Sequence, residues 1–336
     1  DYFNIGLKAF FLGLGIILLI SIYEHLFLNH LPSDFSNHLN HIPPTHGDHK
    51  VPFATFGNPN NLAVYLVFSV ILLRAYAWHT DKNKLLTNIL TALSIGIIIL
   101  TSSKFSIIAL IVFFIFECFL YVISKNHFKI SFLTRYSKWI GLAVFIMACV
   151  YFGGQQLIGY YENPKPINER DSEILMLSVQ SPHQQDTIIN SNQIRLNLVK
   201  NGIHFFKESK GFGQGAGSFR YLIESGKGPY PTRNIVNPHS WIFKLLANYG
   251  IPITLFFIGW LVYCAIIVIK GMIVIREHTK LIPYIFIGGG ILLTYPFISN
   301  APSSFVTNTV NWTMLITLAI TCDKILMKLK QSPKKV

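Results

Sequence analysis

Residues 106–124 read SIIALIVFFIFECFLYVIS, an apolar run long enough to cross the roughly 30 Å hydrocarbon core of a bilayer as one helix. Similar runs recur at 6–26, 61–78, 86–101, 138–153, 249–269, 281–299 and 306–322. With 51% hydrophobic and only 13% charged residues among 336, the chain carries more apolar surface than one water-soluble core could bury. The sequence therefore predicts an all-α integral membrane protein with about eight transmembrane helices.

Lysine and arginine gather in alternate connections between these runs. The connections after the second, fourth and sixth runs and the C-terminal tail are basic, whereas the short connections on the other side hold few Lys or Arg residues. The positive-inside bias predicts that both ends of this chain are cytoplasmic and that segments 27–60 and 154–238 face the outside. The net charge of +13 is spread over these anchoring positions, which argues against a nucleic acid partner.

The sequence predicts one polytopic membrane domain over residues 1–336, with a large extracytoplasmic loop at 154–238 inserted in it. A loop of this length in a compact domain usually binds or catalyses. Part of the loop predicts an amphipathic helix near 191–207, on or near the outer leaflet. Its apolar residues at helical spacing are Ile194, Leu198, Ile203 and Phe206. Because the chain begins at Asp1 without an initiator Met, we expect further spans upstream.

Metal and disulfide chemistry have little support in the sequence. The four cysteines fall within apolar runs, at spacings that fit neither a zinc site nor a disulfide framework, and we expect small buried hydrophobes. They are Cys118, Cys149, Cys264 and Cys322. The first outer segment contains six histidines, with no helical or hairpin spacing that presents three of them together. We expect these imidazoles, His25, His30, His38, His41, His46 and His49, to be solvated and to bind no metal.

Two short outer segments have both a structural and a functional interpretation. In Phe56-Gly-Asn-Pro-Asn-Asn61, Pro59 suits the first turn of a helix and Asn58 can cap its free amides. Alternatively, Asn60 offers an amide to a polar ligand at the outer membrane surface. The turn Thr101-Ser-Ser-Lys104 places one cation at the outer surface, where it could snorkel to headgroups or hold a lipid-linked phosphate.

The outer loop carries a cation and a glycine run. Arg195 lies on the expected amphipathic helix, where sequence alone favours a snorkelling surface charge. The run Gly211-Phe-Gly-Gln-Gly-Ala-Gly-Ser-Phe219 lacks the Lys-Ser/Thr of a P-loop and faces outward, which argues against nucleotide binding. We expect it to form a tight turn that lets backbone approach a ligand or another helix.

The end of the loop contains Asn237-Pro-His-Ser-Trp241, followed by a short helical piece that ends at Gly250 before Pro252 starts the next span. His239 could cap this piece or contact headgroups. Because an unperturbed imidazole has a pKa of about 6.5, His239 is also the natural proton carrier if chemistry occurs here.

Together and in this order, these motifs resemble the O-antigen ligase and polymerase family of bacterial membrane glycosyltransferases, including Gram-positive teichuronic-acid and capsule polymerases. The resemblance runs from about Phe56 to the end of the chain. It implies transfer of a glycan from an undecaprenyl diphosphate carrier to an acceptor glycan, at the outer face of the bacterial cytoplasmic membrane. It also implies inversion at the anomeric carbon, no cofactor, no metal or nucleotide sugar, and other polysaccharide-assembly membrane proteins as partners.

The resemblance also implies roles for particular residues. Arg195 and Lys104 would hold the diphosphate and stabilise the leaving group as the sugar–phosphate bond breaks. His239 would orient the acceptor hydroxyl or take its proton, and Asn60 would support the acceptor or the carrier headgroup. The other substrate-binding residues implied are Asn58, Gly213, Gly215, Ser218 and Asn237. Lys104 stands where the family commonly has Arg, which loses the bidentate fork, and Ser240 stands where it commonly has Asn.

Three other functions stay open. A ligase would share the fold and chemistry but move finished glycan to an anchor. A flippase or other transporter would show internal repeats, broken helices or charges at mid-membrane depth, and the sequence shows no repeat. Its main intramembrane charge, Arg74, lies near enough to the cytoplasmic end of its span to snorkel. A non-catalytic scaffold would tolerate replacement of Arg195 and His239.

Overall fold

The computed structural model describes residues 2–32, 36, 50–79, 84–124, 191–233, 235–238, 240–275, 277–301 and 305–331. Within these residues the chain is helical and contains no strand. The helices are α1 (Tyr2–Phe27), α3 (Pro59–His79), α4 (Lys84–Leu100), α5 (Lys104–Ser124), α8 (Ser191–Glu208), α9 (Ser218–Glu224), α10 (Trp241–Ile273), α11 (Ile282–Ile298) and α12 (Thr309–Gln331). Short 3-10 turns at Thr279–Leu281 and Phe305–Thr307 lead toward α11 and α12. The predicted all-α class is confirmed.

Six of these helices are long and apolar enough to cross a membrane, namely α1, α3, α5, α10, α11 and α12. Helix α4 is apolar but only 17 residues long. The chain is therefore a multi-pass membrane protein. The run predicted at 138–153 and the segment 154–190 lie outside the described residues, so the count of eight spans and the extent of the loop stay predictions.

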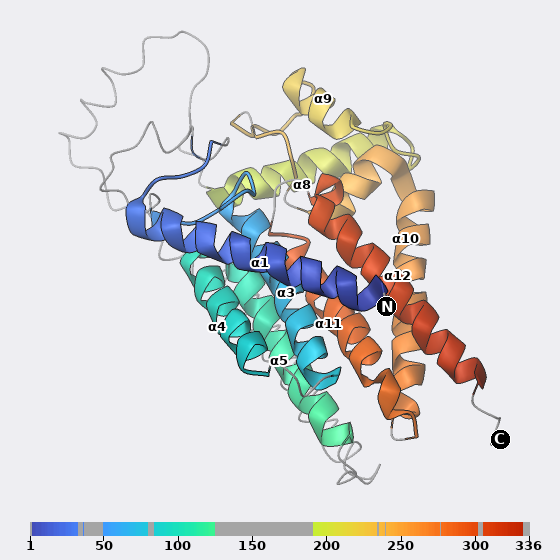
Figure 1. The fold of residues 1–336 in the computed structure, drawn as a ribbon. Helices are drawn as coiled ribbons and strands as arrows, with labels where there is room; N and C mark the ends of the chain where they lie inside the picture. Colours follow the sequence, from blue (N-terminus) through green and yellow to red (C-terminus); the bar gives the residue numbers. More distant parts are fainter. Residues whose placement is uncertain are drawn as a thin grey trace.

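The long helices form a bundle that is covered at one end (Figure 1). Helices α8 and α9 lie across that end, and α1 crosses the outside of the bundle obliquely, in contact with α4. Helices α3, α5, α10 and α12 start at the covered end, whereas α4 and α11 finish there. This alternation brings the start of α3, the turn before α5 and the start of α10 to the same end of the molecule as α8.

Helix α11 occupies the centre of the bundle, packed on α3, α5, α10 and α12. Three consecutive glycines make this close packing feasible. A Cβ added at Gly289 would lie 2.2 Å from Cζ of Phe116 on α5, and one at Gly288 would lie 2.9 Å from Val268 on α10. The absence of side chains on this turn of α11 therefore determines how near its neighbours approach.

The second predicted span begins as a capped helix. The Oδ1 atom of Asn58 accepts a hydrogen bond from the backbone N–H of Asn61 at 3.0 Å, and Pro59 is the first residue of α3. The side-chain oxygen of Asn61 in turn accepts from Asn308 Nδ2 at 3.0 Å, just before α12. The structural interpretation of this segment is thus confirmed, and the same amides tie α3 to α12.

The expectation that Arg74 snorkels to the headgroups is wrong. Its Nε atom donates to Glu117 of α5 at 2.9 Å, and its Nη1 atom donates to Asn88 Oδ1 at 3.0 Å. Trp78 Nε1 also donates to Glu117, at 3.2 Å. A cation between two packed helices is stabilised far more by a carboxylate than by a distant interface. This ion pair lies in the half of α3 and α5 away from α8, and it joins α3, α4 and α5.

Candidate functional site

Helix α8 packs on α9 and on the first turns of α10 through a small apolar cluster separate from the main core. Its members are Ile194, Leu198, Phe205, Phe219 and Ala247. Of the apolar residues predicted to form one face of this helix, Ile194 and Leu198 are buried, but Ile203 is 38% exposed. The helical period from Ile194 passes through Leu198 and Phe205, and Ile203 falls on the opposite side. The apolar face predicted for the leaflet therefore packs partly on protein.

Two buried asparagines of α8 hold the segment that follows α9. Asn201 donates from Nδ2 to the carbonyl of Tyr230 at 2.8 Å, and its Oδ1 accepts from the Tyr230 N–H at 3.0 Å. One turn earlier, Asn197 Nδ2 donates to the carbonyl of Pro231 at 2.8 Å. Amide side chains that match a neighbouring backbone in this way satisfy buried polar groups on both sides. The sequence did not single out either asparagine.

The glycine run packs against a break in α10. Gly250 has a φ of 72° and interrupts the helix, and Pro252 two residues later has no N–H to donate. The carbonyls left without helical partners are those of Ala247 and Asn248, which accept from the N–H groups of Gln214 and Gly215, both at 2.8 Å. In return, the Ile251 N–H donates to the carbonyl of Gly211 at 2.8 Å. The loop thus supplies the hydrogen bonds that the break removes.

The close approach of the loop backbone to the backbone of α10 explains why glycine is needed at two positions. A Cβ at Gly213 would lie 2.5 Å from the backbone nitrogen of Gly250, and a Cβ at Gly250 would lie 2.3 Å from the carbonyl oxygen of Gly211. Both residues also have positive φ, which disfavours any other side chain. The predicted close backbone approach is found, and its partner is the broken helix α10.

Asn248 joins the broken helix to α9. Its side chain is buried, and its Oδ1 accepts from the N–H of Phe219 at 3.0 Å and from the hydroxyl of Ser218 at 3.2 Å. Because the first amides of a helix have no partners within it, this oxygen caps α9 from another helix. Ser218 therefore has a structural partner in the chain, and Asn248 is a residue that the sequence analysis left without a role.

The two predicted diphosphate ligands are exposed cations. Arg195 lies on α8 and Lys104 is the first residue of α5. No hydrogen bond or ion pair joins either one to another described residue, and none joins them to each other. Next to Lys104, the hydroxyls of Ser103 and Ser106 bond each other at 3.0 Å, and Thr101 donates to the Ile98 carbonyl at 2.7 Å. The turn is thus internally bonded while its cation stays accessible.

The remaining candidates are only partly placed. Asn60 and Asn237 are half-buried, and no hydrogen bond joins their side chains to another described residue. His239 lies outside the described residues, although Pro238 and Ser240 on either side of it are described. The structure therefore gathers Gly213, Gly215 and Ser218 against α10, and the roles of all the candidate site residues stay predictions.

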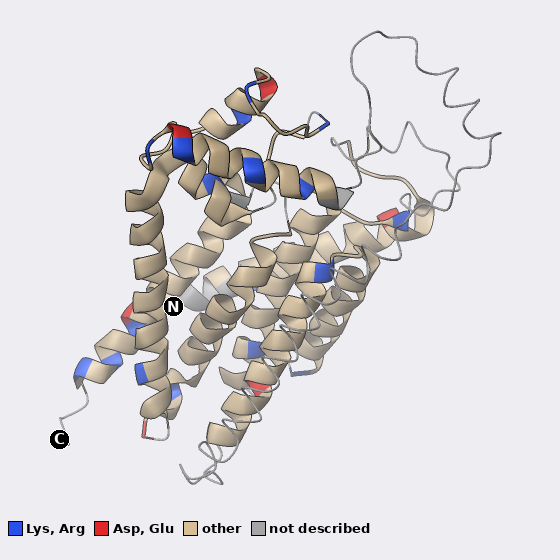
Figure 2. Ribbon diagram, turned by 180° about the vertical axis from the view of Figure 1, so that it is seen from behind, with Lys and Arg blue, Asp and Glu red and all other residues tan. Residues whose placement is uncertain are grey.

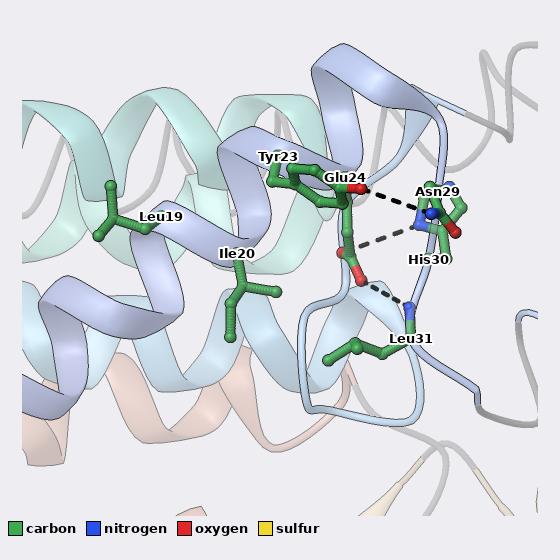
Figure 3. Close-up of a pocket in the computed structure, with 7 residues that line it drawn as sticks. All are labelled: Leu19, Ile20, Tyr23, Glu24, Asn29, His30 and Leu31. Atoms are coloured by element: carbon green, nitrogen blue, oxygen red, sulfur yellow. Dashed lines mark hydrogen bonds and ion pairs between the residues drawn. The ribbon is translucent and has the colours of Figure 1, made fainter.

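A second polar assembly, at the end of α1, was also missed by the sequence analysis. Glu24 is fully buried and accepts hydrogen bonds from the N–H groups of Phe53 at 2.9 Å, Ala54 at 2.7 Å and Leu31 at 3.3 Å. Figure 3 shows this carboxylate beside His30, at the edge of a cavity of about 490 Å³. Because the carboxylate accepts three amide hydrogen bonds, it fastens the end of α1 to the turn before α3.

The histidines near this assembly have partners of their own. His30 stacks on Phe53 with ring centroids 4.8 Å apart, and its Nδ1 lies 3.8 Å from Glu24. His25 Nδ1 lies 2.7 Å from the carbonyl oxygen of Lys50. The expectation that these histidines are simply solvated is therefore wrong for both His25 and His30. The other histidines of this loop lie outside the described residues.

Positive charge dominates the covered end of the bundle (Figure 2). Between residues 191 and 244 there are eight Lys or Arg residues and two Asp or Glu residues. Both acids are engaged locally, Glu208 with His204 at 3.2 Å and Glu224 with Arg220 at 2.7 Å. The described part of this end thus has cations in excess, which suits an anionic ligand.

Comparison with known proteins gives two matches. Residues 89–258, just over half of the chain, match the model of a family described as O-antigen ligase. Over 321 residues the chain is 25% identical to the teichuronic acid biosynthesis protein TuaE of Bacillus subtilis (strain 168). The alignment covers 95% of this chain and 60% of that relative, so the chain spans about 60% of the relative's length.

Proposed function

The chain belongs to the O-antigen ligase family, and on that premise we propose that it polymerises lipid-linked oligosaccharide repeat units into a cell-surface polysaccharide. The donor is a glycan on undecaprenyl diphosphate, the acceptor is another glycan, and transfer occurs at the outer face of the bacterial cytoplasmic membrane. Similarity to a teichuronic acid biosynthesis protein supports assembly of a polysaccharide. The single structural observation that carries the proposal is the cationic end of the bundle, where α8 and the glycine run pack on the broken α10.

In this proposal the diphosphate is the leaving group and exposed cations stabilise it. Arg195 and Lys104 have no acceptor among the described residues, so an anionic substrate would not compete with an existing ion pair. As the bond between the anomeric carbon and the phosphate oxygen breaks, negative charge grows on the diphosphate. Cations that meet this charge lower the barrier. Neither a nucleotide nor a metal has a part in the proposed step.

The acceptor hydroxyl attacks from the opposite face of the sugar, which inverts the anomeric carbon. His239 takes the hydroxyl proton or orients the hydroxyl, a role that fits an imidazole near neutral pH. The hydrogen bonds between the glycine run and α10 support this arrangement, because they restrain the part of α10 before its break, and α10 begins two residues after His239. Asn60 and Asn237 are proposed to bind the acceptor or carrier headgroup.

The experiment is a gel of lipid-linked and surface glycans from a deletion strain that carries the whole gene. The wild type is compared with His239→Ala and with Lys207→Ala, which removes an exposed cation of α8 outside the proposed chemistry. A polymerase predicts single repeats without the long ladder in His239→Ala. Accumulation of long lipid-linked chains would instead identify a ligase. An unchanged ladder in His239→Ala would refute the assigned catalytic role.

A transporter is less well supported. The intramembrane charge that would mark a transport pathway, Arg74, is held by Glu117 and Asn88 between packed helices. Such a pair stabilises a fixed arrangement of α3, α4 and α5. We therefore assign the pair a structural role.

A further inference from the structure

Phe212, in the glycine run, is a large apolar residue that the described chain barely covers. It is 76% exposed. Its backbone is nevertheless held in place. The Phe212 N–H donates to the carbonyl of Ser209 at 3.1 Å, and the N–H of Gly213 donates to the Ser209 hydroxyl at 2.9 Å. A bonded turn therefore presents this residue outward, so little backbone freedom is lost when a partner covers it.

This turn lies where α10 resumes after its break. A single exposed aromatic residue is ordinary on a protein surface, so its neighbours decide what it means. The Ile251 N–H donates to the carbonyl of Gly211 at 2.8 Å, and a Cβ added at Gly250 would collide with the carbonyl group of Phe212. Figure 1 shows α8 ending near the corner where α10 turns to run along the edge of the bundle. Phe212 is thus adjacent to the first turn of the long part of α10.

From Ile251 onward, α10 exposes one continuous apolar face. Its exposed residues recur at intervals of three, four or seven positions, which places them on the same side of a helix. They are Ile251, Leu255, Val262, Ile266, Ile269 and Ile273. Another side of the helix, with Cys264, Ile267 and Val268, is buried in the main core. Because α10 belongs to a multi-pass membrane protein and is long and apolar enough to span the bilayer, this exposed face contacts lipid.

The length of α10 after the break sets the depth of Phe212. Residues 251–273 are about 35 Å long at 1.5 Å per residue, so this part alone crosses a hydrocarbon core of roughly 30 Å. Ile251 therefore lies near the boundary between acyl chains and headgroups, and Phe212 lies beside it. Lys210, two residues earlier, is an exposed cation that can reach headgroup phosphates. The acid nearest to it in the sequence, Glu208, is paired with His204.

We propose that the turn at residues 209–213 is inserted in the bilayer, with the Phe212 ring among phospholipid acyl chains and Lys210 beside their phosphates. Under the predicted topology these lipids belong to the outer leaflet. An apolar ring next to a cation is the combination that binds at the headgroup boundary. The inserted turn fixes the depth of α8 and of the break in α10 relative to the lipid phosphates. The proposal does not depend on the reaction assigned above.

The test measures the depth of Phe212 in the full chain, reconstituted in nanodiscs of phosphatidylglycerol and phosphatidylcholine. A nitroxide label is attached to Phe212→Cys in a background without native cysteines. Electron paramagnetic resonance then measures its collisions with oxygen and with a water-soluble nickel chelate. Oxygen concentrates in the bilayer interior, whereas the chelate stays in water. We expect oxygen to relax the label of Phe212→Cys more strongly than the chelate does.

Tyr221→Cys is the matched control. Tyr221 is likewise an exposed aromatic residue, but it belongs to α9, which lies beyond α8 from the spanning helices (Figure 1). The chelate should relax the same label more strongly there, which would show that the apolar character of the label does not cause the difference. Because both residues are exposed, both labelled proteins should melt like the wild type.

Three outcomes would overturn the inference. Stronger relaxation by the chelate at both positions would place Phe212 in water. Stronger relaxation by oxygen at both positions would show that the label, and not the turn, enters the bilayer. Protection of the Phe212→Cys label from both reagents would show that protein covers it, such as a second copy of this chain.

These outcomes are separable from the proposed function. If the Phe212→Cys label lies in the bilayer while His239→Ala keeps the long glycan ladder, the inference stands and the catalytic assignment of His239 fails. If the label lies in water while His239→Ala loses the ladder, the inference fails and the polymerase assignment stands.

Discussion

At the scale of single residues, Arg195 is an exposed side chain of α8 without a partner among the described residues. Its replacement therefore removes no visible contact within the protein. We predict that Arg195→Ala lowers polymer formation by roughly tenfold or more, because a charge-assisted contact to the diphosphate is lost. The melting temperature of the purified protein should not change. Quantifying the glycan ladder beside the melting curve checks both statements.

Two comparisons sharpen the Arg195 experiment. Arg195→Lys keeps the charge but loses the bidentate fork, so it should retain part of the activity. Lys207→Ala removes a cation from the same helix and should have no effect. Equal loss in Lys207→Ala and Arg195→Ala would show that only the general positive charge of α8 matters.

Glu117 is a residue whose importance lies in stability. Glu117→Gln leaves Arg74 charged between α3 and α5 without its carboxylate. We predict that the free energy of unfolding falls by about 3 kcal/mol. This value is at the low end of the cost of breaking a buried ion pair, because the Arg74 side chain is partly exposed. Denaturant unfolding of the purified protein measures this. Glu277→Gln, the same change at an exposed acid, should cost almost nothing.

The double variant Arg74→Met with Glu117→Leu separates charge from packing. Replacing both members by apolar residues removes the unpaired charge, so much of the lost stability should return. If the double variant is as unstable as Glu117→Gln, the loss must come from packing or from the contacts of Asn88 and Trp78.

At the scale of elements, α8, α9, the glycine run and the first turns of α10 form one assembly, held by an apolar cluster and by backbone and side-chain hydrogen bonds. The helix break at Gly250 and the loop at Gly213 require each other, since each backbone occupies the space that a side chain on the other would need. A change in either element should therefore disturb the segment that carries His239, even though neither glycine has chemistry of its own.

Gly213→Ala tests this dependence. Its Cβ would lie 2.5 Å from the Gly250 nitrogen, in addition to the cost of about 1–2 kcal/mol for a left-handed backbone. The matched control is Gly215→Ala, which also has positive φ but has no atom within 4 Å of the added carbon. We predict that Gly213→Ala lowers the melting temperature and the polymer yield clearly more than Gly215→Ala. Equal effects would mean that backbone strain, and not close approach, decides.

At the scale of the whole molecule, the basic connections predict which end of the bundle faces the cytoplasm. The covered end, with α8 and α9, should lie outside the cell. We predict that a membrane-impermeant maleimide labels Lys227→Cys in intact cells and labels Glu277→Cys only after permeabilisation, both in a background without native cysteines. The reverse pattern would place the cationic end in the cytoplasm and contradict an outer-face reaction.

The local features of this protein can be recognised from its sequence alone. Hydropathy located the helices, Asn58 and Pro59 marked the start of α3, and Gly250 before Pro252 marked the break in α10. The helix predicted at 191–207 corresponds to α8, at Ser191–Glu208. These features depend on residues within a few positions of each other, where helix propensity and capping act. Patterns of that range can be recognised without knowledge of the fold.

Contacts between residues that are distant in the sequence become visible only in the folded chain. Glu117 pairs with Arg74 across 43 positions, Asn248 caps a helix 29 positions earlier, and Glu24 binds amides 29 and 30 positions later. The burial of Lys244 and the exposure of Ile203 likewise follow from the tertiary structure and not from the local sequence. Burial and pairing depend on helices that lie far apart in the chain. A charge therefore loses its water, and a glycine is approached by a neighbouring backbone or side chain, only once these helices have packed together.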